Sequence, residues 1–305
     1  KLGTVPVKGM SLSDAIDSMR GPAGSEIKLT VGRSGESQPF EVTLLRDVIK
    51  VASVRQRWLE PGYGYIRIAQ FQSATGKDVT GALEKLMNKQ KLKGLVLDLR
   101  NNPGGVLRAS VDVAGLFMDG GKVVYTEGRL PNSDMEFNAQ PEDATAGIPI
   151  VVLINSGSAS ASEIVAGALQ DHGRAVIMGT RSFGKGSVQT VLPISDSRAV
   201  KLTTALYFTP NGRSIQAEGI EPDIEVERAK VTAYDNSRRV TEADLTGHLN
   251  NANGEDQSKS KKPASRLLSR DNQLYEALTL LKGINILGLR DNKTANIEQD
   301  ARGES

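Results

Sequence analysis

The sequence of 305 residues contains no cysteine, so no disulfide framework indicates a cellular compartment. Charges nearly balance at a formal +2, and no long basic stretch interleaved with aromatic residues indicates a nucleic-acid partner. No apolar run approaches the roughly 20 residues that span a bilayer, so no transmembrane segment is expected. The first ten residues lack the charged and hydrophobic regions of a signal peptide. We therefore expect a chain of about two domains that begins inside the first of them.

The stretch from residue 148 to 192 carries the most informative patterns. Ile148–Ile154 is an apolar, β-branched run, which predicts a strand buried on both faces. Alternating serines follow and open a helix whose apolar residues recur at helical spacing until Gly173. These serines are Ser156, Ser158, Ser160 and Ser162. A glycine-flanked lysine, Lys185, then leads into an alternating strand at 187–192.

A serine hydroxyl needs a base before it can act as a nucleophile, and the chain has only two histidines. His172 would lie on the same predicted helix as Ser160 and roughly 18 Å from it, at about 1.5 Å rise per residue. His248 falls in a polar segment. The histidine supply therefore argues against a Ser-His-Asp triad and leaves lysine as the base.

Lys185 is a good candidate for that base. A solvated lysine has a pKa of about 10.4, which burial can lower by up to roughly 3 to 5 units. The flanking glycines leave room for close packing, and Phe183 is expected to supply apolar cover. Gln189, four residues along the same predicted strand, would orient the amine without adding charge. Spacing alone does not choose among the four serines.

Three motifs resemble those of the carboxyl-terminal processing proteases, tail-specific serine peptidases that carry a PDZ domain. The motifs are 97–105 (LDLRNNPGG), 158–164 (SASASEI) and 183–189 (FGKGSVQ). The resemblance, which covers most of the chain, implies that Ser160 is the nucleophile, Lys185 its base and Gln189 the residue that orients the base. The implied oxyanion donors are the backbone N–H groups of Gly105 and Ala161. Ala161 would open a helix whose positive dipole end faces the developing charge.

Residues 1–48 look like the second half of a PDZ domain. A capped helix is predicted after Ser11, over 12–19, and a hairpin is predicted from strands at 26–31 and 40–45. In a PDZ domain such a helix lines a groove that adds an extended peptide to a strand edge. The alternative is a small structural cap.

Residues 49–228 are expected to form a layered protease core of the α/β class, with mixed α+β character, because strand and helix patterns alternate along them. Strands are expected at 64–71, 95–99, 148–154, 174–178, 187–192, 199–208 and 220–226, and helices near 79–86, 106–117 and 161–171. The polar residues 129–146 are expected to be a surface excursion.

Residues 229–305 predict a polar linker, from about Thr232 to Ser265, followed by a short helix that ends at Gly283. The helix carries an apolar stripe formed by Leu274, Ala277, Leu278 and Leu281. Packing against its own protomer and packing against a second protomer both stay open for this stripe.

Other interpretations compete with a peptidase. Residues 179–185 fit the start of a phosphate-binding loop, but Gly186 stands where a magnesium-binding Ser or Thr is needed and a strand pattern follows. The serines could simply cap a helix, with Ser158 or Ser162 as the N-cap, which would leave the lysine loop unexplained. The alternative function is a catalytically silent, PDZ-type peptide-binding scaffold.

The resemblance implies a serine endopeptidase that cleaves proteins engaged through their C-terminal tails, without cofactor or metal. It also implies a place in the bacterial periplasm or cell envelope, and gating by the PDZ domain or an adaptor protein. The striped helix that follows the linker predicts, in addition, a homo-oligomer. We expect the helix at 271–282 to lie in the oligomer interface, with Leu274, Leu278 and Leu281 buried there.

Overall fold

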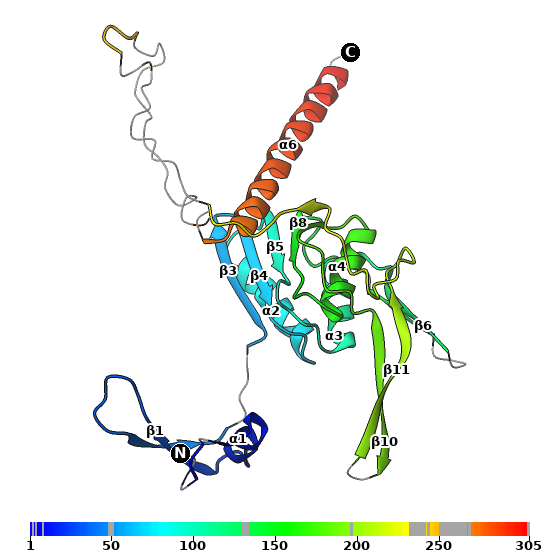
Figure 1. Cartoon of the computed structure of the whole chain (residues 1–305). Helices are drawn as coiled ribbons and strands as arrows, with labels where there is room; N and C mark the ends of the chain where they lie inside the picture. Colours follow the sequence, from blue (N-terminus) through cyan, green and yellow to red (C-terminus); the bar gives the residue numbers. More distant parts are fainter. Residues whose placement is uncertain are drawn as a thin grey trace. The chain divides into compact units, whose positions relative to one another are not determined.

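The computed structural model describes the chain in two compact units, residues 1–52 and residues 53–305 (Figure 1). The description leaves out residues 2, 4, 8, 48–51, 130–133, 196–197, 232–241, 243–244, 250–266, 268–269 and 304–305, and the side chains of 289–303. The linker expected at 232–265 and the expected start of the core near Ile49 thus lie mostly outside the described residues. None of the described helices is long and apolar enough to cross a bilayer.

The first unit consists of a helix and a hairpin, as the sequence predicts. Helix α1 (Leu12–Met19) begins after Ser11, whose hydroxyl accepts a hydrogen bond from the backbone N–H of Asp14. Strands β1 (Glu26–Val31) and β2 (Phe40–Leu45) pair in antiparallel register. Among the apolar side chains described in this unit, only Ala15 is fully buried. The unit therefore has little core of its own.

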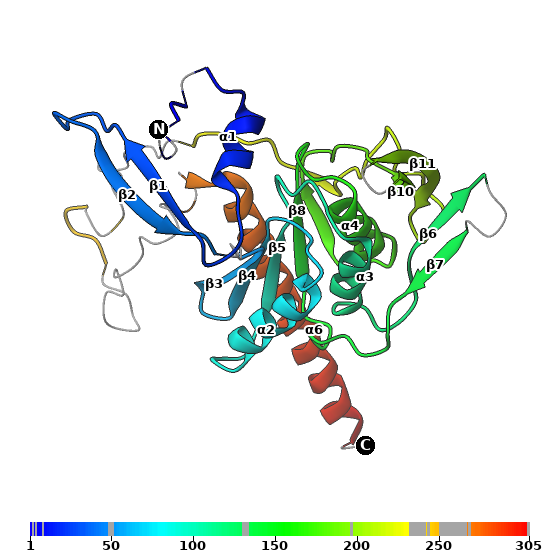
Figure 2. The same ribbon diagram turned by 90° about the horizontal axis from the view of Figure 1, so that it is seen from below.

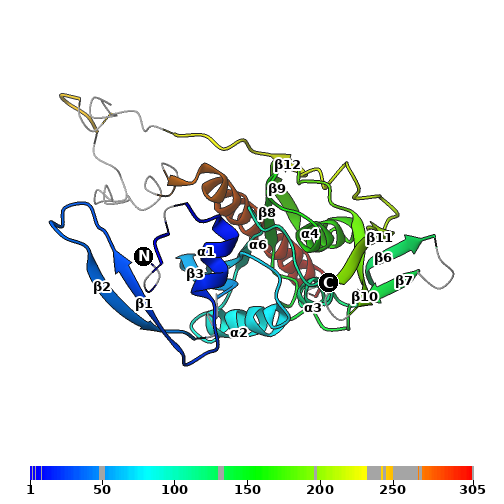
Figure 3. The same cartoon turned by 60° about the horizontal axis from the view of Figure 1, so that its bottom comes forward.

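A six-stranded sheet in the order β12-β9-β8-β5-β4-β3 forms the centre of the second unit (Figure 3). All neighbours pair in parallel except β3, which is antiparallel at the edge. The strands are β3 (Val54–Glu60), β4 (Tyr63–Ile68), β5 (Gly94–Asp98), β8 (Ile150–Ile154), β9 (Val176–Gly179) and β12 (Ile224–Glu225). Every residue of β5 and β8 is buried, as their unbroken apolar runs predict.

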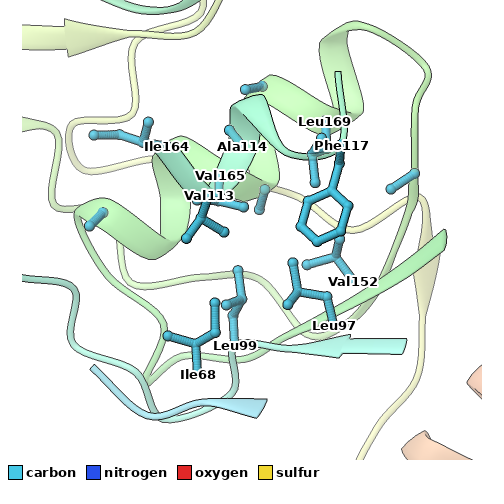
Figure 4. Packing of buried hydrophobic residues seen from close by; sticks show 14 of the residues in the cluster. Ile68, Leu97, Leu99, Val113, Ala114, Phe117, Val152, Ile164, Val165 and Leu169 are labelled. Carbon is cyan, nitrogen blue, oxygen red and sulfur yellow. The ribbon is translucent and has the colours of Figure 1, made fainter. Parts of the chain in front are cut away.

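Three helices cover one face of this sheet. They are α2 (Thr75–Met87), α3 (Leu107–Gly115) and α4 (Ala161–Asp171). Helix α2 connects the parallel strands β4 and β5, and α4 connects the parallel strands β8 and β9, whereas α3 follows β5. Figure 4 shows the resulting core, in which Val113, Phe117 and Val165 pack on Leu97 and Val152 of the sheet. Helix α4 begins at Ala161 and is followed by Gly173 at a φ of +61°, so both predicted ends are confirmed.

The first part of helix α6 (Asn272–Gly303), which includes Leu274 to Leu281, packs on the opposite face of the sheet (Figure 2). The expected end at Gly283 is wrong, because the helix continues past it. The expected burial of the stripe in an oligomer interface is also wrong. Its four apolar residues are at most 2% exposed within the protomer itself, where they pack on β4, β5, β8 and β9.

A second sheet is antiparallel, in the order β10-β11-β6-β7. Its strands are β6 (Lys122–Gly128), β7 (Met135–Asn138), β10 (Ser187–Ser195) and β11 (Arg198–Phe208). Strand β7 lies within the expected surface excursion at 129–146, where mostly exposed side chains concealed the strand pattern. The expected strand at 220–226 is reduced to the two residues of β12.

Candidate active site

Two loops meet at the carboxyl ends of the neighbouring strands β5 and β8, which run parallel to each other. The first loop, residues 99–105, follows β5, and the second, residues 155–160, follows β8. The backbone N–H of Ala159 donates to the carbonyl oxygen of Asn102 at 3.0 Å. Two side chains, Asn101 and Asn155, also bond to each other at 3.0 Å. The strand order therefore brings together motifs that lie more than 50 residues apart in sequence.

The structure separates the four serines by environment. Ser158 and Ser162 are fully buried and donate to the carbonyl oxygens of Leu99 and Asn102, at 2.8 and 2.9 Å, so their hydroxyls fasten the two loops together. Ser156 is exposed, and Ser160 is half-buried. The expectation that Ser158 or Ser162 is the N-cap is wrong, because the N-cap position of α4 is Ser160.

Ser160 has a strained backbone, with φ +55° and ψ −113°. Residues other than glycine rarely adopt positive φ, and such strain is concentrated at functional sites. Here it accompanies a sharp turn from strand β8 into helix α4, similar to the strand-to-helix turn that carries the nucleophile in α/β-hydrolases. The turn is held because the Ser160 N–H donates to Glu163 Oε2 at 2.7 Å.

Gly104 and Gly105 pack the first loop against this turn. Their φ angles are +98° and +142°, in the region that favours glycine. A Cβ atom on Gly104 would lie 2.8 Å from Cβ of Ser160 and 3.0 Å from the nitrogen of Ala161. Within the described part of the chain, the N–H groups of Gly105 and Ala161 have no acceptor. Two unpaired backbone donors thus lie on the two segments that meet beside Ser160.

Glu163 was not among the predicted site residues. It joins the serine turn to the loop that carries Lys185, residues 180–186 between β9 and β10, which we call the lysine loop. Its side chain is fully buried and accepts four hydrogen bonds. Oε1 accepts from Ser182 Oγ and from the Gly184 N–H, both at 2.6 Å. Oε2 accepts from the N–H groups of Ser160 and Lys185, at 2.7 and 2.9 Å. The backbone N–H groups of both candidate catalytic residues therefore donate to the same carboxylate oxygen, which fixes the two backbones relative to each other.

The lysine loop is packed closely at its glycines. A Cβ atom on Gly186 would lie 2.3 Å from the backbone nitrogen of Gln216, which explains why glycine is required there. Lys185 is half-buried and lies in the loop before β10, so its expected place on the strand is wrong. The expected cover from Phe183 is also wrong, because that side chain is 66% exposed.

Gln189 lies on β10 beside a bulge and is exposed. Within the described residues, no hydrogen bond joins its amide to Lys185. His172 ends α4 and bonds through Nε2 to the carbonyl oxygen of Lys122 at 2.8 Å, away from the serine turn at the other end of the helix. A strand follows the lysine loop, which contradicts the phosphate-binding-loop interpretation.

Comparison with known proteins gives the family. A carboxy-terminal-processing protease of Bartonella bacilliformis is 47% identical over 293 residues, which are 93% of this chain and 66% of that protein. A carboxyl-terminal-processing protease of Synechocystis is 41% identical over 75% of this chain and 54% of its own length. The chain thus spans roughly half to two-thirds of these relatives.

A solved structure, the photosystem II D1 C-terminal processing protease, is 36% identical and superposes with a TM-score of 0.53, over 74% of this chain and 62% of that one. Its mixed α/β architecture agrees with the fold described above. The sequence model of peptidase family S41 matches residues 62–226, and this range contains both loops, the serine turn and the lysine loop. The chain belongs to peptidase family S41.

Proposed function

We propose that this protein is a serine endopeptidase that cleaves protein substrates engaged through their C-terminal tails. The observation that carries the proposal is the strained Ser160 turn, tied through Glu163 to the Lys185 loop and packed against the glycines of the first loop. Membership of peptidase family S41 and the names of the curated relatives support the same activity.

In the proposed reaction, Ser160 Oγ attacks the scissile carbonyl while Lys185 Nζ takes the hydroxyl proton. The N–H groups of Gly105 and Ala161 stabilise the resulting oxyanion, and the first turn of α4 adds its positive dipole end. Lys185 then gives its proton to the leaving amine, and an acyl-enzyme ester remains on Ser160. Attack by water on this ester, with Lys185 again as the base, restores the enzyme.

Glu163 and Gln189 have different parts in this proposal. Glu163 acts through backbone N–H groups, so it positions the serine turn and the lysine loop without touching substrate. Gln189 is proposed to orient the Lys185 amine once a substrate lies along β10. Its place on the same segment, four residues after the lysine and at a bulge that redirects side chains, supports this role.

The first unit is proposed to bind substrate tails as part of a PDZ-like domain. An apolar cavity of about 580 Å³ lies between α1 and the hairpin, and its lining includes Ile16, Ile27, Leu29 and Leu44. Apolar grooves beside a helix and a strand edge suit extended peptides. Engagement of a tail there, or of an adaptor protein, is proposed to gate cleavage.

Two further expectations stay predictions. The first is a bacterial cell-envelope or periplasmic location, and the two relatives named above come from bacteria. Assembly into a homo-oligomer is expected to use a surface other than the stripe of α6, because those side chains are already buried in the protomer.

The test is cleavage of one unstructured protein substrate by the unchanged chain and by Ser160→Ala. The proposal predicts fragments from the unchanged chain only, with the variant still binding the substrate tail. A chain that binds the tail without Ser160-dependent cleavage would instead be the peptide-binding scaffold.

A further inference from the structure

Helix α6 lies outside the residues matched to family S41, yet it is attached to the strands that lead into the site loops. Its stripe packs on β4, β5, β8 and β9, on the face opposite α2, α3 and α4 (Figures 1 and 2). The side chains beneath it include Val96 of β5 and Leu153 of β8. Two of the strands under α6, β5 and β8, thus lead directly into the loops at 99–105 and 155–160.

A buried guanidinium joins the start of α6 to the first of these loops. Arg100 is 8% exposed, and its five N–H donors are all used. Nε and one Nη2 N–H bond to Asp98, at 3.0 and 2.7 Å. The others bond to both oxygens of Asp271, at 2.9 and 2.7 Å, and to Gln273 Oε1 at 2.8 Å. We call Asp98, Arg100, Asp271 and Gln273 the Arg100 clamp.

Arg100 itself lies in the first loop, residues 99–105, which we call the oxyanion loop because it carries Gly105. Asn101, the next residue, has a φ of +55°, and its N–H donates to Asn155 Oδ1 at 2.9 Å. The same oxygen accepts the Gly157 N–H at 3.0 Å. Any rotation of the Arg100 backbone would therefore disturb the Asn101–Asn155 pair, which links the loop of Gly105 to the turn of Ser160.

The charges of the Arg100 clamp favour this arrangement. Burial alone would raise the pKa of Asp271, but the hydrogen bonds and charge of Arg100 outweigh it and hold the pKa below its ordinary value. Asp98 is fully buried and also accepts from Tyr65 Oη at 2.8 Å and from Arg67 at 3.1 Å. Removing Asp271 would leave two N–H groups of the buried Arg100 guanidinium without an acceptor. The guanidinium would then move toward other acceptors.

We propose that Asp271 and Gln273 are positioning residues for proteolysis, which hold the oxyanion loop through Arg100. The C-terminal helix is then a working part of the site as well as a cover for the sheet. This inference rests on the proposed function, because it assigns the Gly105 N–H to the oxyanion.

The variants Asp271→Ser and Gln273→Ala test this inference in the full chain. Serine can replace aspartate as N-cap of α6, where Asp271 Oδ1 now accepts the Leu274 N–H, so the helix start is kept while the Arg100 contact is lost. Lys282→Ala is the matched control. It removes another ion pair of α6, with Glu60 at 2.5 Å, that has no part in the Arg100 clamp.

Two readouts are needed: kcat and KM on an unstructured protein substrate below the melting temperature, and hydrogen exchange of the hydrogen-bonded amides of Asn101, Asn102 and Gly104. Loss of one oxyanion donor lowers kcat by about 10² to 10³, so a displaced donor should cost at least about tenfold. We expect that fall in both Asp271→Ser and Gln273→Ala, with KM within about twofold and faster exchange at these amides. Lys282→Ala should match the unchanged chain in both.

Unchanged kcat and exchange in Asp271→Ser, in a protein whose cleavage depends on Ser160, would overturn the positioning role and leave the proposed function intact. A fall in kcat without faster exchange would also overturn it, because the loop would not have moved. If the unchanged chain shows no Ser160-dependent cleavage, the proposed function fails, and the exchange data alone decide whether α6 holds the loop.

Discussion

Glu163→Gln is the sharpest perturbation of the site, because it removes a charge while keeping the size of the side chain. Glutamine has one oxygen and one NH₂ where Glu163 has two acceptor oxygens. If the NH₂ replaces Oε2, it faces the N–H groups of both Ser160 and Lys185. If it replaces Oε1, the Gly184 N–H and the Ser182 O–H lose their acceptor, but the Ser182 hydroxyl can rotate and accept from the new NH₂. The second orientation is therefore the less costly one.

One buried donor left unpaired costs about 1–3 kcal/mol. If this whole free-energy cost is expressed as misplacement of Ser160 and Lys185 in the transition state, kcat/KM falls roughly five- to 150-fold. The assay is cleavage of an unstructured substrate, together with thermal unfolding. Glu221→Gln is the control, since that carboxylate is 73% exposed and pairs only with Arg181 among the described residues. Unchanged kcat/KM in Glu163→Gln would refute the positioning role, even if the melting temperature fell.

Three other changes have defined outcomes. Gly104→Ala should abolish most cleavage and lower the stability to urea, because the new Cβ would collide with Ser160. Gly81→Ala should do neither, because a Cβ at that position meets no atom within 4 Å. Leu278→Asp should lower the melting temperature without changing the molar mass in light scattering, since a buried, unpaired carboxylate costs several kcal/mol. The lowered pKa of Asp271 stabilises the fold, and this contribution is complete at pH values above the ordinary pKa of about 3.9. It is lost as pH falls through the folded-state pKa. Asp271→Ser should therefore flatten that part of an acid unfolding curve followed by circular dichroism.

Local patterns in the sequence were sufficient to predict most helices and strands of the core. The unbroken apolar runs of β5 and β8 predict buried strands, and the serine-rich turn followed by Gly173 predicts both ends of α4. The stop at Gly283 failed because a glycine inside a helix costs only about 1 kcal/mol, which the docked helix around it can tolerate.

The site contacts that were not predicted join residues far apart in sequence. Glu163 stands three residues after Ser160, as in a capping box, but its bonds to Ser182 and Gly184 depend on how the lysine loop folds back over α4. Arg100 meets Asp271 across 171 residues of sequence. No periodicity links such pairs, so only the folded chain reveals them.

The most direct test of the central claim is covalent labelling of the full chain with a serine-directed fluorophosphonate, followed by peptide mapping in a mass spectrometer. The account predicts one adduct, on Ser160, whose formation is lost in Lys185→Ala. The same adduct should form in Ser156→Ala, because that neighbouring hydroxyl is exposed and outside the strained turn. An adduct on another serine, or a Ser160 adduct that forms equally fast without Lys185, would contradict the assignment of nucleophile and base.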